Sequence, residues 1–246
     1  SVSAFLLNRS SDLEILSEGY TKVVYDTDDP ELTVIEFKDT VTAFRNIKRA
    51  TIKGKGRLTC RVSSLIMGYL NSKGLKTHFV KADGDNGQVC LKVRVIPVRI
   101  IMRNAAAGSI VRTFGIPAGT ALKHPVVEMT YKNNDLDNPI INRDHADALG
   151  IATYEETEAM IETSRKVNSL LCELFASIGV QLVDFKIEFG YTADGTMVIT
   201  DEISPDTCRF RNMSDGRQMD RDRYRYDQGD IIDTYQELTN RLEKAL

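Results

Sequence analysis

The chain has few of the side chains from which disulfide frameworks, zinc sites and histidine-based catalytic sites are built. Its 246 residues include four cysteines and three histidines. The cysteines are far apart and form no CxxC pair: Cys60, Cys90, Cys172 and Cys208. We therefore expect reduced thiols in a cytoplasmic protein, and neither a zinc site nor a catalytic triad that depends on histidine.

Long apolar runs and a large net charge of either sign are also missing. No run approaches the roughly 20 apolar residues needed to cross a bilayer, and Ser1–Asn8 lacks the basic segment of a signal peptide. The formal charge is only −3, with acidic and basic residues interspersed. The sequence therefore predicts neither a nucleic acid nor a membrane as a partner.

What is present is an ordinary globular composition, with 42% hydrophobic and 27% charged residues. Segments of strand composition dominate the N-terminal part: Glu14–Leu16, Lys22–Tyr25, Leu32–Phe37 and Val89–Ile96. Apolar residues at helical spacing predict helices at Leu58–Lys73, Thr153–Ile178 and Asp230–Leu246, with Gly74 and Gly179 as stops.

Pro97 is a natural border, after which a new strand is expected at Val98–Met102. The order of elements predicts an α+β fold of two lobes. A small β-rich lobe would comprise residues 1–97 and a larger α+β lobe residues 98–246, with a ligand cleft between them.

Two segments late in the chain are the most informative. Val183–Gly190 and Asp201–Arg209 are both predicted to be strands, and Asp194-Gly195 between them predicts a hairpin turn. Side chains alternate between the faces of a strand. The charged residues of the first strand therefore share one face, and the partner strand brings Asp201 near it.

The shared face would carry Asp184, Lys186 and Glu188. Several carboxylates beside a cation suit a magnesium–nucleotide site, because Mg²⁺ takes one or two protein carboxylates and completes its shell with phosphate oxygens and water. The alternative is an amphipathic hairpin whose charged side faces solvent.

Two loops of the first lobe carry groups suited to anions. A hairpin at Gly19 followed by Lys22 would let backbone N–H groups and an ammonium approach phosphate oxygens, although one glycine in a hairpin is usually only a turn. The basic loop Ile52–Arg57 is more often a solvated turn than an anion site.

Two segments of the second lobe are also ambiguous. Arg103–Ser109 combines donors for a carboxylate or phosphate with small residues that permit close approach, but a tightly packed strand-to-helix connection has the same pattern. Asp220–Arg225, with Arg209 upstream, is either a solvated charged face or a clamp for a substrate phosphate.

These residues resemble, in order and over nearly the whole chain, the phosphoribosylaminoimidazole-succinocarboxamide synthase (SAICAR synthetase) family. The matching motifs are Glu18-Gly19, Lys22, Val24-Tyr25, Phe37-Lys38-Asp39, Thr42-Ala43-Phe44, Gly54-Lys55-Gly56, Ile96-Pro97, Arg103-Asn104, Ala106–Ser109, Tyr131–Asn133, Pro139, Asn142, Leu149-Gly150, Val183–Lys186, Glu188–Gly190, Asp201-Glu202, Ser204–Asp206, Arg209, Asp222-Arg223 and Arg225. The strand pair from Val183 to Arg209 is highly specific to that family, whereas the glycine loop is not.

The resemblance implies a two-lobed fold whose small antiparallel lobe is like that of protein kinases, with ATP and Mg²⁺ held between the lobes. It implies a ligase that forms an amide between the carboxylate of carboxyaminoimidazole ribonucleotide and the amine of L-aspartate, giving ADP and phosphate in purine biosynthesis. It also implies a homo-oligomer, a dimer.

By position, the resemblance implies roles for individual residues. Those implied to bind the nucleotide are Gly19, Lys22, Val95 (with the backbone near Arg94), Glu188 and Asp201, of which Glu188 and Asp201 would hold Mg²⁺. Those implied to bind the acid substrate are Arg103, Ser109, Asp184, Lys186, Asp206, Arg209 and Arg225, with Lys186 and Asp184 as catalytic residues.

Several positions depart from the family pattern, and they cluster at expected phosphate, metal and substrate positions. They are Tyr20 in place of a lysine, Arg45 and Asn46 after Phe44, Asn138 in place of an aspartate that can serve a second metal, and Arg211-Asn212 in place of Trp-Asp. A paralogue that joins an amino acid to a related heteroaromatic acid in nucleoside secondary metabolism is therefore the main alternative.

Two further alternatives come from other classes of protein. A non-catalytic nucleotide sensor would need Lys22 but neither Glu188 nor Asp201, and both are present. A kinase would carry a His-Arg-Asp or Asp-Phe-Gly tripeptide, and neither occurs.

Overall fold

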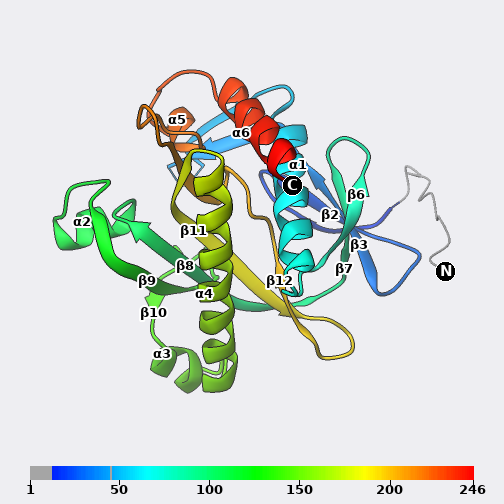
Figure 1. The fold of residues 1–246 in the computed structure, drawn as a ribbon. Helices are drawn as coiled ribbons and strands as arrows, with labels where there is room; N and C mark the ends of the chain where they lie inside the picture. The colour runs from blue at the N-terminus through cyan, green and yellow to red at the C-terminus, as the bar shows by residue number, and fades with distance from the viewer. Residues whose placement is uncertain (1–12, 45) are drawn as a thin grey trace.

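The computed structural model describes residues 13–44 and 46–246. The expectations for Ser1–Asn8 and Arg45 fall outside the described residues. The described chain forms a five-stranded sheet, a six-stranded sheet and a two-stranded hairpin, with helices packed around them (Figure 1). The predicted α+β fold is confirmed.

The smaller lobe is the five-stranded antiparallel sheet. Its strands lie in the order β1 (Ile15–Glu18), β2 (Lys22–Asp26), β3 (Leu32–Phe37), β7 (Gly87–Leu91) and β6 (Phe79–Asp83). Val34 and Phe37 of the central strand are buried, as suits β-branched and aromatic residues. The N–H of Gly19 donates to the carbonyl of Lys22 at 2.9 Å and closes the hairpin between β1 and β2.

The larger lobe is the six-stranded sheet. Its strands lie in the order β10 (Ile140–Ile141), β9 (Ala121–Tyr131), β8 (Arg94–Ala105), β11 (Val180–Tyr191) and β12 (Met197–Thr200), and β13 (Cys208–Asn212) also pairs with β11. One face is apolar, because the antiparallel register sets Phe185 opposite Met102 and Ile187 opposite Ile100. The other face carries the charged residues.

The long helix α4 (Tyr154–Ser177) packs on the apolar face. It begins at a capping box, in which the Thr153 hydroxyl accepts from the Glu156 N–H at 3.1 Å and the Glu156 carboxylate accepts from the Thr153 N–H at 2.8 Å. The remaining helices of this part of the chain are α2 (Ser109–Phe114), α3 (Arg143–Ala148), α5 (Asp222–Arg225) and α6 (Ile232–Ala245).

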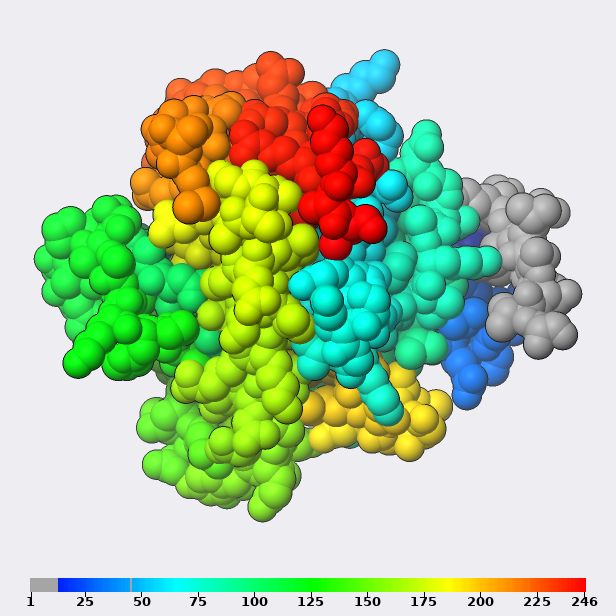
Figure 2. Space-filling view, in the orientation of Figure 1, coloured from blue at the N-terminus to red at the C-terminus, as the bar shows by residue number. Residues whose placement is uncertain are grey.

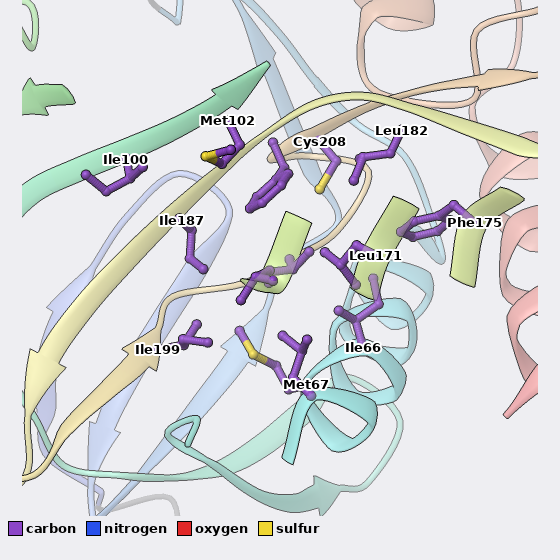
Figure 3. Packing of buried hydrophobic residues seen from close by; sticks show 14 of the residues in the cluster. Ile66, Met67, Ile100, Met102, Leu171, Phe175, Leu182, Ile187, Ile199 and Cys208 are labelled. Carbon is purple, nitrogen blue, oxygen red and sulfur yellow. The ribbon is translucent and has the colours of Figure 1, made fainter. Parts of the chain in front are cut away.

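The two lobes meet along α1 (Lys55–Ser72) and the segment that follows it. Ile66 and Met67 of α1 pack with Leu171 of α4 in one core (Figure 3). In the face shown in Figure 2, α1 lies below α6, between α4 and the strands of the smaller lobe. The backbone of Ile199 in β12 bonds to Lys76 and His78, at 2.9 and 2.8 Å, which ties the edge of the larger sheet to the start of β6.

The predicted helices are confirmed with small changes at their ends. The first begins at Lys55, earlier than expected, and ends before Gly74, whose φ of +81° is left-handed. The last begins at Ile232 instead of Asp230. None of the helices among the described residues is long and apolar enough to span a membrane.

Two predictions of continuous strands are wrong. Val89–Ile96 is divided, because β7 ends at Leu91 and the chain crosses to the other sheet before β8 starts at Arg94. Asp201–Arg209 is mostly a loop: β12 ends at Thr200, and the left-handed φ of +65° at Asp201 turns the chain away until β13 starts at Cys208.

The hairpin of β4 (Thr40–Ala43) and β5 (Lys48–Thr51) follows the central strand of the smaller lobe. Strand β8 runs without a break through Pro97, so the strand expected at Val98–Met102 is the middle of a longer one. The lobe boundary at Pro97 stays a prediction.

Candidate active site

The charged face of the larger sheet carries the predicted acidic cluster. Asp184 lies opposite Arg103 on the neighbouring strand, and Glu188 lies opposite Arg99. Asp184 and Glu188 are only 3% and 1% exposed. The interpretation of this hairpin as a solvated charged face is therefore wrong.

A cavity of about 400 Å³ lies between the two lobes. The five residues expected to bind a nucleotide all line it: Gly19, Lys22, Val95, Glu188 and Asp201. Apolar side chains, among them Val24, Ile35 and Leu91, form the rest of its wall. A pocket whose lining combines apolar side chains with charged groups suits a nucleotide, which has an apolar base and charged phosphates.

Lys22 and Asp201 form an ion pair in this cavity. The Lys22 ammonium also lies 3.0 Å from a carboxylate oxygen of the buried Glu202. Burial alone would lower the pKa of Lys22 and raise that of Asp201, but the pairing outweighs burial and shifts both pKa values the other way. Both groups are therefore held in their charged forms.

Asp201 is held in its unusual conformation by His78. The Nε2 of this buried imidazole lies 2.9 Å from the carbonyl oxygen of Asp201, and its Nδ1 lies 3.1 Å from the Thr200 hydroxyl. Because a carbonyl only accepts, Nε2 carries the proton and Thr200 donates to Nδ1. Burial lowers the pKa of His78 to about 4, so the ring is neutral at physiological pH.

Lys186 lies between the two predicted metal ligands. Its ammonium is 3.9 Å from Glu188 and 3.7 Å from Asp201. No group of three or more His, Cys, Asp or Glu residues within 13–44 and 46–246 forms a metal cage. Two carboxylates that converge on one cation, with no further protein ligand, fit Mg²⁺ bound together with phosphate oxygens.

A second cavity, of about 260 Å³, is lined by Lys186, whose ammonium lies 3.7 Å from Asp201 and 3.9 Å from Glu188, two residues that line the first cavity. Six of the seven residues expected to bind the acid substrate line it: Arg103, Ser109, Asp184, Lys186, Asp206 and Arg209. Arg225 does not line it. It borders a smaller cavity of about 60 Å³ with Arg209 and forms an ion pair with Asp222.

Buried ion pairs organise this second cavity. Asp184 accepts from Arg103 at 2.6 Å and from Arg209 at 2.8 Å, and Arg103 also donates to Ser109 at 2.9 Å. Burial alone would lower the pKa of Arg209, but Asp184 and Asp222 raise it above its usual value. The site therefore presents fixed positive charges to an anionic ligand.

The segment from Arg103 to Ser109 combines the two roles that its sequence left open. Ala105 and Ala106 are buried, as expected of a packed connection. Gly108 has a left-handed φ of +64°, and a Cβ there would lie 3.1 Å from the Arg209 guanidinium. The small residues thus allow the arginine into the cavity.

The interpretation of the Ile52–Arg57 loop as a solvated turn is wrong for Lys55. Its side chain is 1% exposed and forms an ion pair with Asp206. The other oxygen of Asp206 accepts from the Tyr235 hydroxyl at 3.0 Å. The glycines on either side of Lys55 indicate an unusual backbone conformation in this loop. The ion-pair partner of Lys55 is 151 residues away in the sequence, so no local pattern predicts the pair.

None of the departures from the family pattern among the described residues lines either cavity. The Arg49 guanidinium stacks on the Tyr20 ring at 4.5 Å, beside the glycine hairpin. Asn138 accepts a hydrogen bond from Arg99. Asn212 accepts from Arg241, away from both cavities. Nothing in the described residues explains Arg211.

Comparison with known proteins agrees with this geometry. The family model described as SAICAR synthetase matches residues 15–242. The chain is 45% identical over 232 residues to the phosphoribosylaminoimidazole-succinocarboxamide synthase of Clostridium botulinum (strain Alaska E43 / Type E3), covering 94% of this chain and 99% of that protein.

Solved structures give the same result. A SAICAR synthetase in complex with ADP matches with a TM-score of 0.90 and 41% identity, over 93% of this chain and 97% of that one. The phosphoribosylaminoimidazole-succinocarboxamide synthase of Ehrlichia chaffeensis matches with a TM-score of 0.91 and 38% identity, over 95% of this chain and 99% of that one. This chain therefore belongs to the SAICAR synthetase family.

Proposed function

We propose that this protein is the ATP-dependent ligase that joins carboxyaminoimidazole ribonucleotide to L-aspartate in purine biosynthesis. The products are the succinocarboxamide SAICAR, ADP and phosphate. The observation that carries the proposal is that Lys186 lines the second cavity and places its ammonium 3.7 Å from Asp201 and 3.9 Å from Glu188 of the first, so that a nucleotide and an acid bound in the two cavities would meet at that ammonium.

In this proposal the first cavity binds ATP. The backbone of the Gly19 hairpin and the ammonium of Lys22 bind the phosphates, and the β8 backbone at Val95 meets the base. Glu188 and Asp201 would hold Mg²⁺, which supplies positive charge that stabilises phosphoryl transfer. The ADP complex of a SAICAR synthetase with the same fold supports this assignment.

The second cavity binds the ribonucleotide acid. Arg103 and Arg209, oriented by Asp184, attract its negative groups, and Ser109 supplies a neutral donor. Asp206 forms part of the wall of this cavity. Arg225 lies beyond Arg209, beside the smaller cavity, and a substrate phosphate there would bind the guanidinium that now pairs with Asp222. Lys186 and Asp184 are the proposed catalytic residues: both line this cavity, Lys186 reaches the carboxylates of the first cavity, and Asp184 orients the two arginines.

The chemistry needs no nucleophile from the protein. An oxygen of the substrate carboxylate attacks the γ-phosphorus of ATP, ADP leaves, and an acyl phosphate forms. The aspartate amine then attacks the acyl carbon, loses a proton and expels phosphate, which carries away the attacking oxygen. Lys186 would stabilise the charge on the transferring group in the first step.

The paralogue with a different acid or amino acid is not favoured, because identity of 45% extends over 94% of the chain. The predicted homodimer, cytoplasmic location and lack of nucleic-acid or membrane partners stay predictions. Four free cysteines, three of them buried, are consistent with a reducing compartment.

The function is tested by incubating the protein with ATP, Mg²⁺, L-aspartate and carboxyaminoimidazole ribonucleotide, and omitting one component at a time. Mass spectrometry should detect the amide, with one phosphate released per amide, only in the complete mixture. Parallel mixtures with other amino acids and heteroaromatic ribonucleotide acids serve as controls. Amide from one of these, and none from the named pair, would reject the assignment.

A further inference from the structure

Arg99 lies next to Glu188, which lines the nucleotide cavity. The two residues are cross-strand neighbours on β8 and β11, so the sheet register places their side chains on the same face. The Nε of Arg99 donates to one oxygen of Glu188 at 2.8 Å, and its Nη1 donates to the Asn138 side-chain oxygen at 2.5 Å. One guanidinium thus joins the buried carboxylate to the amide.

Both carboxylate oxygens of Glu188 have cationic partners. Its second oxygen accepts from Lys132 at 2.5 Å, and Lys186 lies 3.9 Å from the first. Asp201, by contrast, is 18% exposed at its side chain, and its partners are Lys22 and Lys186. Of the two predicted metal ligands, Asp201 is the more accessible.

Sites of phosphoryl transfer neutralise the nucleotide with one or two divalent ions together with arginine or lysine side chains. A divalent ion beside Glu188 and Asn138 would have to displace Arg99 and Lys132, and the Asn138 amide brings no negative charge to attract it. The residues around Glu188 therefore do not fit a second divalent ion, although Glu188 and Asp201 together fit one.

We propose that Arg99 is a built-in cation and a positioning residue, which takes the place of a second divalent ion beside Glu188. Arg99 fixes the orientation of Glu188 and Asn138, and the enzyme binds one divalent ion with each nucleotide. This inference rests on the proposed ATP-binding function, because it concerns the same cavity.

The test counts metal ions and does not depend on turnover. Electron paramagnetic resonance measures the Mn²⁺ bound to the whole protein at saturating β,γ-imido ATP, which cannot be hydrolysed. The native protein should bind one Mn²⁺ per bound nucleotide. The double variant Arg99→Gln/Asn138→Asp, which removes the guanidinium and restores a carboxylate, should bind two.

Matched variants distinguish the positive charge of Arg99 from the shape of its guanidinium, and both from the general effect of removing an arginine. Arg99→Lys keeps a positive charge and should still bind one Mn²⁺, as should Asn138→Asp alone, because Arg99 would pair with the new carboxylate. Arg112→Gln, on the exposed surface of α2, should also leave the count at one.

Two Mn²⁺ ions in the native protein would overturn the inference while leaving the proposed function intact. So would a single Mn²⁺ in a double variant that is folded and binds the analogue. If the double variant does not fold, the native count alone decides. Failure of the native protein to bind the analogue would instead reject the proposed function itself.

Discussion

Replacing Lys55 by methionine should destabilise the protein strongly. The Lys55 and Asp206 side chains are 1% and 3% exposed, and they form an ion pair far from solvent. Removing one partner of a buried pair leaves an uncompensated charge, which costs about 3–5 kcal/mol. For a chain of this length each kcal/mol lowers the melting temperature by about 2–4 °C, so we expect a decrease of about 6–20 °C.

The loss should also depend on pH. Burial alone would raise the pKa of Asp206, but Lys55 and then Arg221 lower it below its usual value. In the native protein its stabilising contribution is therefore present above the unfolded pKa of about 3.9 and is lost as the pH falls through the lower folded value. Without Lys55, burial favours the neutral acid, and stability decreases as the pH rises above about 4.

Urea denaturation of the native protein and of Lys55→Met, at about pH 5.0 and about pH 7.5, measures this effect directly. The difference in unfolding free energy should be larger at the higher pH. Lys55→Met/Asp206→Asn should recover most of the loss, because neither charge remains. Arg61→Met is the control, since Arg61 pairs with Glu243 on the exposed surface and should cost less than about 1 kcal/mol. A pH-independent loss for Lys55→Met no larger than that of the control would refute the reasoning.

Three other changes test the site. Asp201→Asn should reduce turnover by at least about 10–100-fold in a protein that still folds, whereas Asp194→Asn in the exposed hairpin turn should not; equal rates would remove Asp201 from the metal site. His78→Asn should cost about 1–3 kcal/mol of stability by leaving the Asp201 carbonyl unsatisfied. His78→Gln should cost less, because its amide nitrogen can take the place of Nε2. The reverse order of the two variants in urea denaturation would contradict the assigned hydrogen bond. Burial and the neighbouring Asp222 raise the pKa of Asp220 to about 7. The unfolding free energy of the native protein should therefore fall as the pH rises from about 4 to 7 and then level off. Asp220→Asn should show a smaller fall when urea denaturation is repeated over this pH range.

The sequence was sufficient to predict what depends on local alternation and on helix ends. The charged and apolar faces of β11 follow from strand periodicity, which placed Asp184 and Glu188 together correctly. The helix predicted at Thr153–Ile178 follows from the helical spacing of its apolar residues, and the structure adds a capping box at Thr153. Most of the residues expected at the two cavities line them, because the resemblance covered whole motifs.

What the sequence did not reveal depends on contacts between distant segments. The apolar run of Val89–Ile96 has the same composition on both sides of the crossing from one sheet to the other. The buried partner of Lys55 and the partners of Arg99 come from other parts of the chain. Side chains of this kind are recognised only after the topology has brought them together.

The central claim is that the ligase activates a carboxylate by transferring the γ-phosphoryl group of ATP to it. The direct measurement uses carboxyaminoimidazole ribonucleotide labelled with ¹⁸O in both carboxylate oxygens, and mass spectrometry of the phosphate released during one round of synthesis. The account predicts one ¹⁸O atom in each phosphate and one in the amide carbonyl. Phosphate free of ¹⁸O, released together with the amide, would contradict it.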